Sequence, residues 1–452
     1  MIEFLGYPKL DKKLKYMEIL FICILIFGTK GYLFLELIPI VYFYIKRKEI
    51  DLKEIYELIK ISLFYKLMLV LIYPYGNMLN ETFRAMMILV LYEIFYLKKN
   101  IKLIKKDNWI VLGVTSIYVL SLIWNYFSPG GIESFKLYSE KYKVLLFLPI
   151  LCYLYKENIR LLLMVERLLP LCIVGMLIKF IELDFSLEQI YILKGSIISV
   201  FSLIIPYTFF YVFNDKNYKV KLISTCLLIL GIWIVIKAGA RGALFSLIIS
   251  ISIGIILKYR IKGVIGAILG SFILLGIVKA NPRLENHFMQ VQDFSTRSRY
   301  YLIDAGIYTF KNNIVFGSGR GNTQKYFIEY SEKEFDPRKK LIADYPWEED
   351  IVKNNYLRNF PDTHNIFVDS IAENGVLGIV QVIFIWILIP LSVLFTYLKK
   401  KKYIYLGIFS SFIGFISAGM SWSLWTKHSL GVLYFIVILF IYIQNSEALE
   451  SN

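Results

Sequence analysis

Apolar residues along this chain gather in long runs with short charged breaks between them. A transmembrane helix needs ~20 predominantly apolar residues, and most of the runs approach that length. The pattern predicts an all-α, polytopic inner-membrane helix bundle of about 12–14 spans. The first two runs are short, so they form either two spans or one re-entrant pair; both counts are even, which puts both termini on one side. The runs lie at about 17–29, 31–45, 57–73, 84–97, 109–127, 143–155, 161–181, 193–213, 222–236, 242–257, 263–279, 376–398, 403–421 and 429–445.

Composition supports this interpretation. The 452 residues are 57% hydrophobic and 19% charged, whereas soluble domains are roughly 45–50% apolar and ~25% charged. These values exclude a soluble enzyme, a coiled coil and a disordered regulator. No cleavable signal peptide is visible, so we expect the first helix to stay in the membrane. The four cysteines fall inside apolar runs without metal-ligand spacing, and we expect buried small hydrophobes at Cys23, Cys152, Cys172 and Cys226.

The net charge of +16 is unevenly distributed. Alternate loops carry 25 Lys and Arg residues, and the short loops between them carry about seven. This alternation is the positive-inside pattern, so it predicts cytoplasmic termini. The basic balance is therefore a topology signal and not a nucleic-acid footprint.

One loop differs from the others. Residues 280–363 hold twelve Lys/Arg and twelve Asp/Glu and lie outside by the same alternation. A long loop with mixed charge and aromatic residues predicts a folded extracytoplasmic cap, and long loops often carry function. The expected organisation is an N-terminal transmembrane bundle at 1–279, the large periplasmic loop at 280–363 and C-terminal transmembrane helices at 364–452.

Of three histidines, His364 has the most informative context. Asp362 or Thr363 is suited to cap a helix that ends at Gly375. This places the imidazole in the first helical turn, where the helix dipole favours a neutral histidine that accepts a proton near pH 7. The alternative is an interfacial histidine that only caps a helix.

Arginines on the predicted outer side are candidates for binding an anion. Arg241 is flanked by small residues where the ninth run turns into the tenth; the alternative is a snorkelling arginine. Arg297 and Arg299 open a predicted helix capped by Thr296 or Ser298, where free backbone N–H groups favour phosphate oxygens. The alternative there is a solvated basic loop.

The segment VFGSGRGN, residues 315–322, follows a helix and lacks the Lys-Ser/Thr of a P-loop. It is read as a tight turn and not as a nucleotide site. No Asp/His cluster has metal-ligand spacing, so neither a metal nor a cofactor is expected.

Together these features resemble the O-antigen ligase and polymerase superfamily of bacterial membrane glycosyltransferases. The ligase signature is His-Asn/Ser/Gln, nine residues, Gly, two residues and Gly/Thr/Tyr. An acid often precedes its first glycine, and upstream lie a small-residue-flanked arginine and an arginine-led helix before a Gly-x-Gly turn. The aromatic residue that the family has four positions after that arginine is Ile303 here, which leaves Arg297 and Arg299 as alternatives. The matching residues are Arg241, Arg299, Gly317, Gly319, His364, Asn365, Glu373, Gly375 and Gly378.

The resemblance implies a GT-C-like fold and a glycan donor carried on undecaprenyl diphosphate. It implies inverting transfer to an acceptor hydroxyl, of lipid A-core lipopolysaccharide or a similar glycolipid or glycan, on the periplasmic face of the inner membrane. Fixed arginine charge suits the diphosphate without a metal, and His364 suits the role of general base. Membrane lipids are expected partners, and nucleic acid is not.

Two other function classes remain open. An O-antigen or capsule repeat-unit polymerase would use the same donor and nearly the same residues. A lipid-linked oligosaccharide flippase also fits fourteen spans, but it would place charges at the membrane midplane and would not need the long external segment.

Overall fold

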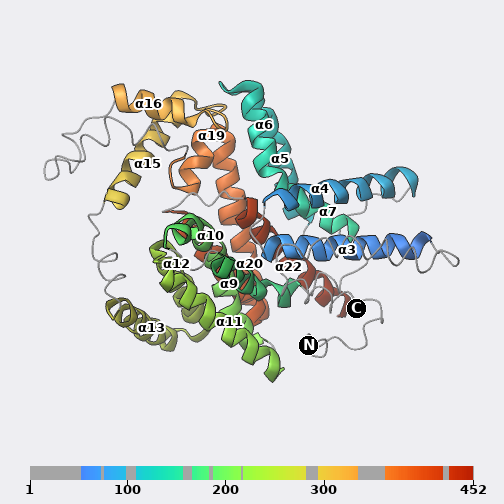
Figure 1. The fold of residues 1–452 in the computed structure, drawn as a ribbon, viewed down its shortest axis with the longest axis vertical. Helices are drawn as coiled ribbons and strands as arrows, with labels where there is room; N and C mark the ends of the chain where they lie inside the picture. The colour runs from blue at the N-terminus through green and yellow to red at the C-terminus, as the bar shows by residue number, and fades with distance from the viewer. Residues whose placement is uncertain are drawn as a thin grey trace.

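The computed structural model describes residues 52–72, 76–97, 108–155, 165–182, 187–214, 217–280, 294–333, 362–420 and 427–450. Within these ranges the chain is helical, and no strand occurs (Figure 1). The two short apolar runs before residue 46 lie outside the described residues. The protein is an all-α polytopic membrane protein, as predicted; the count of 12–14 spans stays a prediction.

The apolar runs and the helices coincide closely along the described chain. A π-helical turn, Tyr92–Tyr96, extends the helix Gly76–Leu91, and another, Val382–Leu388, joins the helices Ile366–Gln381 and Ile389–Lys400. The sixth run begins with the 3₁₀ turn Lys143–Leu146, and the seventh contains one at Leu169–Leu171. The helices are α3 (Leu52–Ile72), α4 (Gly76–Leu91), α5 (Asn108–Phe127), α6 (Gly131–Tyr142), α7 (Phe147–Leu154), α9 (Cys172–Glu182), α10 (Leu187–Asn214), α11 (Tyr218–Lys237), α12 (Arg241–Tyr259), α13 (Ile261–Lys279), α15 (Phe294–Asn312), α16 (Thr323–Lys333), α19 (Ile366–Gln381), α20 (Ile389–Lys400), α21 (Tyr403–Gly419) and α22 (Lys427–Glu450).

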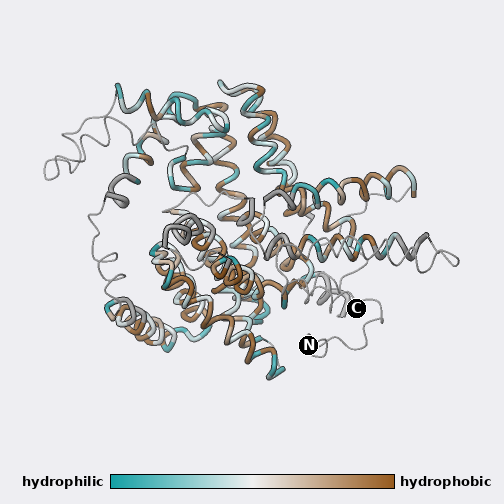
Figure 2. The backbone as a smooth tube through the Cα atoms, in the orientation of Figure 1, coloured by the Kyte–Doolittle hydropathy of each residue, from teal (hydrophilic) through white to brown (hydrophobic). Residues whose placement is uncertain are grey.

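Many helices expose apolar faces. Along α13, Ile265, Leu269 and Phe272 are each more than half exposed, and Figure 2 shows brown, hydrophobic residues over α10 to α13. Surfaces of this kind fit a lipid environment, because a soluble monomer rarely exposes large apolar patches. Five described helical segments are long and apolar enough to cross a membrane: Trp109–Phe127, Ile197–Asn214, Tyr218–Lys237, Arg241–Tyr259 and Ile366–Lys400.

Helices α10, α12 and α21 form the centre of the bundle. Small residues on α21 let it approach α10 closely: a Cβ on Gly414 would lie 2.2 Å from the Ser202 carbonyl oxygen. The Ser411 hydroxyl donates to the Leu203 carbonyl at 2.7 Å. Small residues at a helix contact bring two backbones together, which is how membrane helices commonly pack.

Helices α12 and α21 run antiparallel, and this fixes which ends lie together. The hydroxyls of Tyr259 and Tyr403 are 3.4 Å apart, so the last residue of α12 meets the first residue of α21. Arg241, the first residue of α12, therefore lies at the end where α21 finishes. At that end the Asn365 amide donates to the Met420 carbonyl at 3.2 Å. Arg241 and the start of α19 consequently share one end of the bundle.

The segment 280–363 contains two described helices, α15 and α16, which share a small apolar core. Its buried members are Tyr301, Leu302, Ala305, Phe327 and Tyr330.

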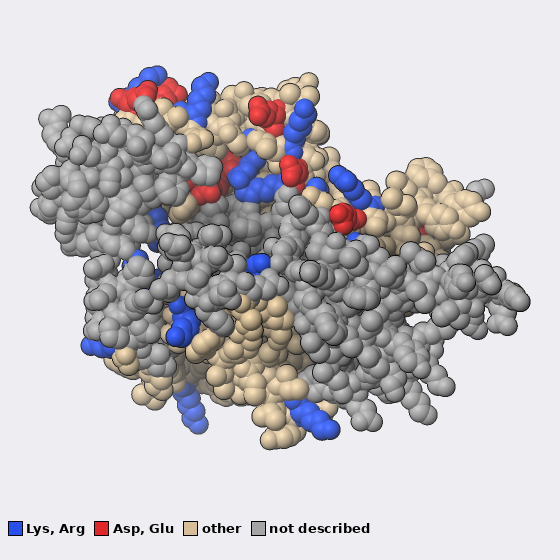
Figure 3. Space-filling view, viewed as in Figure 1, with Lys and Arg blue, Asp and Glu red and all other residues tan. Residues whose placement is uncertain are grey.

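On the face drawn in Figure 3, Asp and Glu lie in the upper part, together with Lys and Arg, and the lower part shows only Lys and Arg. The domain boundaries at 279 and 363 stay a prediction.

Candidate functional site

A break in α19 at Gly375 shapes the candidate site. Gly375 has φ of +57°, and the helix resumes in a new direction after it. The Val376 N–H bonds to the Ile314 carbonyl at 2.9 Å, so it leaves the Ala372 carbonyl without its helical donor. The Ser318 N–H takes that place at 2.9 Å, and the Gly319 N–H bonds to the Glu373 carbonyl at 3.0 Å. The glycine turn after α15 thus satisfies the backbone groups that the break exposes.

Glycine is required on both sides of this contact. A Cβ on Gly317 would lie 2.4 Å from the Glu373 carbonyl, and a Cβ on Gly375 would lie 2.4 Å from the Ile314 and Val315 oxygens. On Gly378 it would lie 2.1 Å from the Ser370 oxygen, where the two halves of the bent helix meet. Gly317 and Gly375 also have positive φ, a conformation that glycine adopts without steric cost. The glycines of the signature therefore allow α19 to bend at Gly375 and the turn at Gly317 to pack against it.

Residues 315–322 form the predicted tight turn. Gly317, Gly319 and Gly321 all have positive φ, and the Trp124 indole N–H donates to the Val315 carbonyl at 2.8 Å. The turn docks on α19 and carries Arg320 into the site, which the sequence analysis did not predict.

His364 lies before the helix and not in its first turn, so that prediction is wrong. The cap is Asn365, whose side chain accepts from the N–H groups of Phe367 and Val368 at 3.0 and 3.1 Å. Three residues of cap-forming type, Asp362, Thr363 and Asn365, lie within the four positions before α19, and the sequence alone does not show which of them caps it. His364 instead has φ of +54°, an uncommon conformation for a non-glycine residue.

The strained turn brings the His364 imidazole against a carboxylate. Nδ1 of His364 lies 2.7 Å from Oδ1 of Asp362, which also accepts from the His364 backbone N–H at 3.1 Å. Burial raises the pKa of the Asp362 carboxyl, but the hydrogen bond and charge of His364 outweigh it, so the pKa lies below its usual value. An ionised Asp362 accepts a hydrogen bond from the Nδ1–H of the neutral imidazole and so leaves Nε2 free of a proton and oriented for proton transfer. The side chains are 15% and 18% exposed, which leaves the pair within reach of a substrate.

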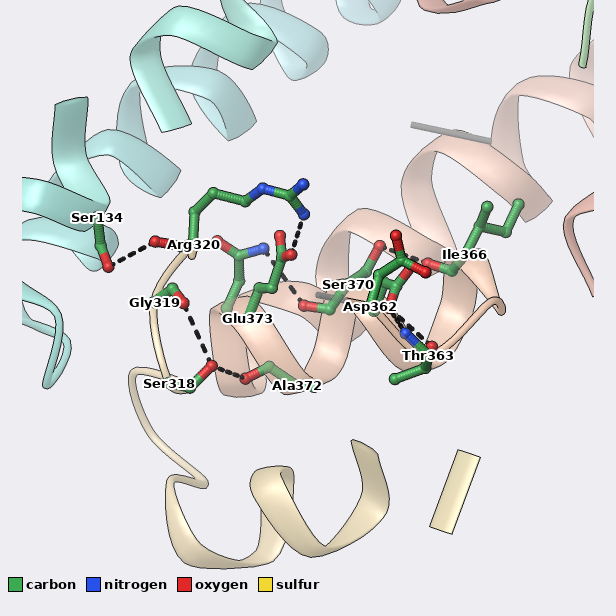
Figure 4. A network of polar contacts seen from close by, with 12 residues as sticks. Ser134, Ser318, Gly319, Arg320, Asp362, Thr363, Ile366, Ser370, Ala372 and Glu373 are labelled. Carbon is green, nitrogen blue, oxygen red and sulfur yellow. Dashed lines mark hydrogen bonds and ion pairs between the residues drawn. The ribbon is translucent and has the colours of Figure 1, made fainter. Parts of the chain in front are cut away.

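A second carboxylate fixes the same turn. Oδ1 of Asp369 accepts from the backbone N–H and from the hydroxyl of Thr363, each at 2.7 Å. Both residues are buried, and Figure 4 shows Thr363 beside Asp362 at the start of α19. The positive φ at His364 is thus held by contacts on both sides of it.

Glu373 pairs with Arg320 from the glycine turn (Figure 4). Glu373 is buried and the Arg320 side chain is 16% exposed. Burial has the largest single effect and lowers the pKa of the guanidinium, but Glu373, Tyr142, Asp369 and Asp362 together raise it by more, so the pKa lies above its usual value. Glu373 is part of the predicted signature but Arg320 is not, because the two are 53 positions apart and only the docked turn brings them together.

The hairpin of α5 and α6 completes this part of the molecule. Oδ1 of Asn125 accepts from the Arg320 backbone N–H at 2.7 Å, and its amide donates to Oδ1 of Asn374 at 2.8 Å. The Ser134 hydroxyl donates to the Arg320 carbonyl at 2.8 Å. At the end of α19, the Gln381 amide donates to the Ser121 hydroxyl of α5 at 2.6 Å. The first half of the chain therefore positions residues of the second half.

Lys141, near the end of α6, faces the same charges. Burial and then the charge of Arg320 lower the pKa of its ammonium to about 7, while Glu373, Asp369 and Asp362 act in the opposite direction. Lys141 has no distinguishing pattern in the sequence, because only the fold brings it within range of the charge of Arg320.

The structure separates the two arginine alternatives on α15. Helix α15 begins at Phe294, so Thr296 and Ser298 lie inside it, and the prediction that one of them caps it is wrong. Several neighbouring Ser and Thr residues can each form a cap, so the sequence alone did not fix where the helix starts. A Cβ on Gly306 would lie 2.5 Å from Thr363 and Val368, so this face of α15 rests on the start of α19. Arg299 lies seven residues before Gly306 and therefore on that face, whereas Arg297 lies nine before and does not.

The remaining predicted residues lie as follows. Arg241 is at the same end of the bundle as His364, as shown above. The side chain of Arg297 lies outside the described residues, and so do His287 and the side chain of His428, which are the two other histidines of the chain. In the described part of the chain, no group of three His, Cys, Asp or Glu residues is placed to hold a metal ion.

These features agree with a comparison with known protein families. Residues 226–383 match the family model described as O-antigen ligase, which covers about a third of the chain. Over these residues the chain is similar to the O-antigen ligase family. The resemblance found in the sequence is confirmed, and the match supports a membrane protein of the ligase or polymerase type. A search of curated proteins finds no match.

The matched range includes α12, α15, the glycine turn and all of α19. It therefore includes Arg241, Arg299, Arg320 and His364. The α5–α6 hairpin, with Asn125 and Lys141, lies outside the matched range although it contacts the same site.

Proposed function

We propose that the protein transfers a glycan from undecaprenyl diphosphate to an acceptor hydroxyl on the periplasmic side of the inner membrane. The observation that carries the proposal is the Asp362–His364 pair, held 2.7 Å apart at the start of α19 inside the matched range. A ligase that uses a glycolipid acceptor, such as a lipid A-core, is the first candidate. A repeat-unit polymerase, whose acceptor is a second lipid-linked glycan, is the alternative.

In the proposed step, Nε2 of His364 accepts the proton of the acceptor hydroxyl, and Asp362 holds the imidazole through Nδ1. The acceptor oxygen bonds to the anomeric carbon with inversion. The bond from that carbon to the diphosphate oxygen breaks, and its electron pair leaves with undecaprenyl diphosphate. The atoms balance with no further reactant.

Arg241 and Arg299 are proposed to hold the diphosphate. Arg241 shares an end of the bundle with His364, and Arg299 lies on the face of α15 that rests on α19. Arginine binds phosphate oxygens bidentately and keeps its charge, so it stabilises the departing diphosphate without a metal. This geometry favours Arg299 over Arg297.

The experiment uses the purified full chain in detergent, undecaprenyl-diphosphate-linked glycan and two acceptors in parallel reactions. Product on the glycolipid supports the ligase, and elongated lipid-linked glycan supports the polymerase. No product with either acceptor, together with glycolipid movement across vesicles, would support the flippase instead.

Arginine variants test the anion site within the same assay. Arg241→Ala and Arg299→Ala should each cost at least ~2 kcal/mol of transition-state stabilisation. Lys311→Ala, at an exposed position on α15, is the matched control and should retain activity. Wild-type activity in both arginine variants would remove the proposal for the diphosphate, and activity lost to EDTA and restored by magnesium would show a metal requirement.

A further inference from the structure

The end of the bundle that lies opposite the candidate site carries cations and tyrosines in close contact. There α12 ends, α13 begins and α21 follows α20. Nζ of Lys258 lies 4.2 Å from the centre of the Tyr403 ring, and the hydroxyls of Tyr259 and Tyr403 are 3.4 Å apart. A Cβ on Gly263 would lie 2.5 Å from the Ile255 carbonyl oxygen, so the start of α13 packs on the end of α12. Direct contacts therefore bring the three segments together.

The basic cluster at this end consists of Lys258, Arg260, Lys262 and Lys401. Lys258 is partly buried and the other three are exposed. Helices α12, α13, α20 and α21 contain no Asp or Glu. At the neighbouring end of α10, the Glu166 carboxylate accepts from the Asn214 amide at 3.2 Å. Positive charge therefore dominates the surface that the four helices form at this end.

The basic cluster lies at the level where the membrane spans end. The membrane-long segments Arg241–Tyr259 and Ile366–Lys400 both finish here. Large apolar side chains adjoin the cations: Ile261 of α13 is 79% exposed and Phe395 of α20 is 65% exposed. Basic residues and tyrosines are the side chains that favour the boundary between lipid and water. The surface thus offers charge to a headgroup and apolar contact to the acyl chains beside it.

Two of the cations occupy backbone conformations that favour glycine. Arg260, between α12 and α13, has φ of +53°, and Lys401, directly after α20, has φ of +56°. Glycine adopts positive φ without steric cost, and it is the commonest residue just after a helix end. Local backbone preference therefore does not account for a cation at either position, and strain of this kind often accompanies a function.

The chemistry of the basic cluster fits a phosphodiester. The Tyr403 ring holds the ammonium of Lys258 through a cation–π contact, and the guanidinium of Arg260 is suited to bind two phosphate oxygens at once. A small soluble anion would cover the charges alone. An anionic phospholipid covers both the charges and the exposed apolar side chains next to them.

We propose that the basic cluster binds the phosphate headgroup of an anionic phospholipid in the membrane leaflet at this end, with the acyl chains against α13 and α20. The bound lipid connects the α12–α13 turn to the α20–α21 turn. The cluster lies at the opposite end of the bundle from Arg241 and His364, so the proposal does not depend on glycan transfer.

The binding experiment uses the full chain in dodecyl maltoside and phosphatidylglycerol with a fluorescent label on one acyl chain, followed by fluorescence anisotropy. The double variant Arg260→Gly, Lys401→Gly should lower the affinity about fivefold for each charge removed. Glycine also relieves the positive φ at both positions, so the melting temperature without added lipid should stay the same or rise. A purely structural role for these residues would not combine lower lipid affinity with undiminished stability.

A matched control removes the same number of charges elsewhere. Lys136→Gln with Lys311→Gln, at exposed positions on α6 and α15, should bind the labelled lipid as wild type does. Lys258→Gln tests the basic cluster at a helical position, so its result does not depend on a change of backbone preference. Unchanged affinity in both Lys258→Gln and the double glycine variant, or an equal loss in the control, would overturn the proposal.

Competing ligands identify the occupant. Phosphatidylcholine with the same label should bind more weakly than phosphatidylglycerol, because its headgroup has no net charge. Equal affinity for the two lipids would overturn the role of the headgroup. Displacement of the labelled lipid by equal concentrations of glycerol 3-phosphate or polyglutamate would assign the basic cluster to a soluble anion and overturn the phospholipid.

Discussion

The bundle of α10, α12 and α21 and the polar end around α19 satisfy their polar side chains in different ways. In the bundle, hydroxyls mostly return to carbonyls of their own helix: Ser246 to Ala243 at 2.7 Å, Ser250 to Leu247 at 3.3 Å and Thr208 to Ile204 at 2.7 Å. At the polar end, Asn125 bonds to Asn374, a residue 249 positions away. Local bonds keep their partners when helices shift, whereas long-range bonds hold the helices in one arrangement.

The difference follows from the surroundings of each region. Helices in lipid must satisfy their backbone internally, and a hydroxyl that bonds within its own helix adds little requirement for a neighbour. The polar end must hold a broken helix, a glycine turn and a histidine with positive φ. Contacts between distant segments supply that order, so substitutions there should cost more than substitutions in the bundle.

The largest expected effect concerns His364. His364→Ala should lower turnover by ~10²–10⁴-fold, the range for losing a general base, while donor affinity stays close to that of wild type because the arginines hold the diphosphate. Paired measurements of donor binding and transfer rate in one detergent preparation test this. A donor affinity that collapses together with the rate would place His364 in the diphosphate site, and a near-wild-type rate would refute the catalytic assignment.

Gly375→Ala should have the next largest effect, and its matched control is Gly270→Ala in α13. The first substitution places a Cβ at positive φ against two carbonyl oxygens, which should cost about 3–5 kcal/mol of stability, in the range for combined backbone strain and steric overlap. Nothing lies within 4 Å of a Cβ at Gly270, so alanine should be neutral or stabilise by up to ~1 kcal/mol. Thermal unfolding in detergent compares the two, and equal melting temperatures would contradict the close contact at the bend.

A smaller effect is expected for Asn125→Ala. It removes the donor to Oδ1 of Asn374 and the acceptor of the Arg320 backbone N–H, which should cost about 1–3 kcal/mol. Ser250→Ala removes only a bond within its own helix and should cost less than ~1 kcal/mol. If unfolding measurements gave the reverse order, the distinction between the two regions would be wrong.

Several features of the candidate site could be read from the sequence. The spacing from His364 to Gly375 and Gly378 identified the ligase signature, and Glu373 and Gly317 were found with it. These are local patterns, since a tight turn, a bend and a helix start each depend on a few adjacent residues. The cap of α19 and the start of α15 were wrong, because neighbouring Ser, Thr, Asp and Asn residues all form caps.

What the sequence determined by itself was the helical membrane bundle, because runs of apolar residues have only a few ways to satisfy their backbone in lipid. What the tertiary structure decided was which polar groups meet. Arg320 pairs with Glu373 only because the glycine turn docks on the broken α19, and Asn125 bonds to Arg320 and Asn374 only because the α5–α6 hairpin packs beside them. Hydrogen bonds and ion pairs between distant segments leave no periodic trace in a single sequence, so the charges of the site became visible only in the folded chain.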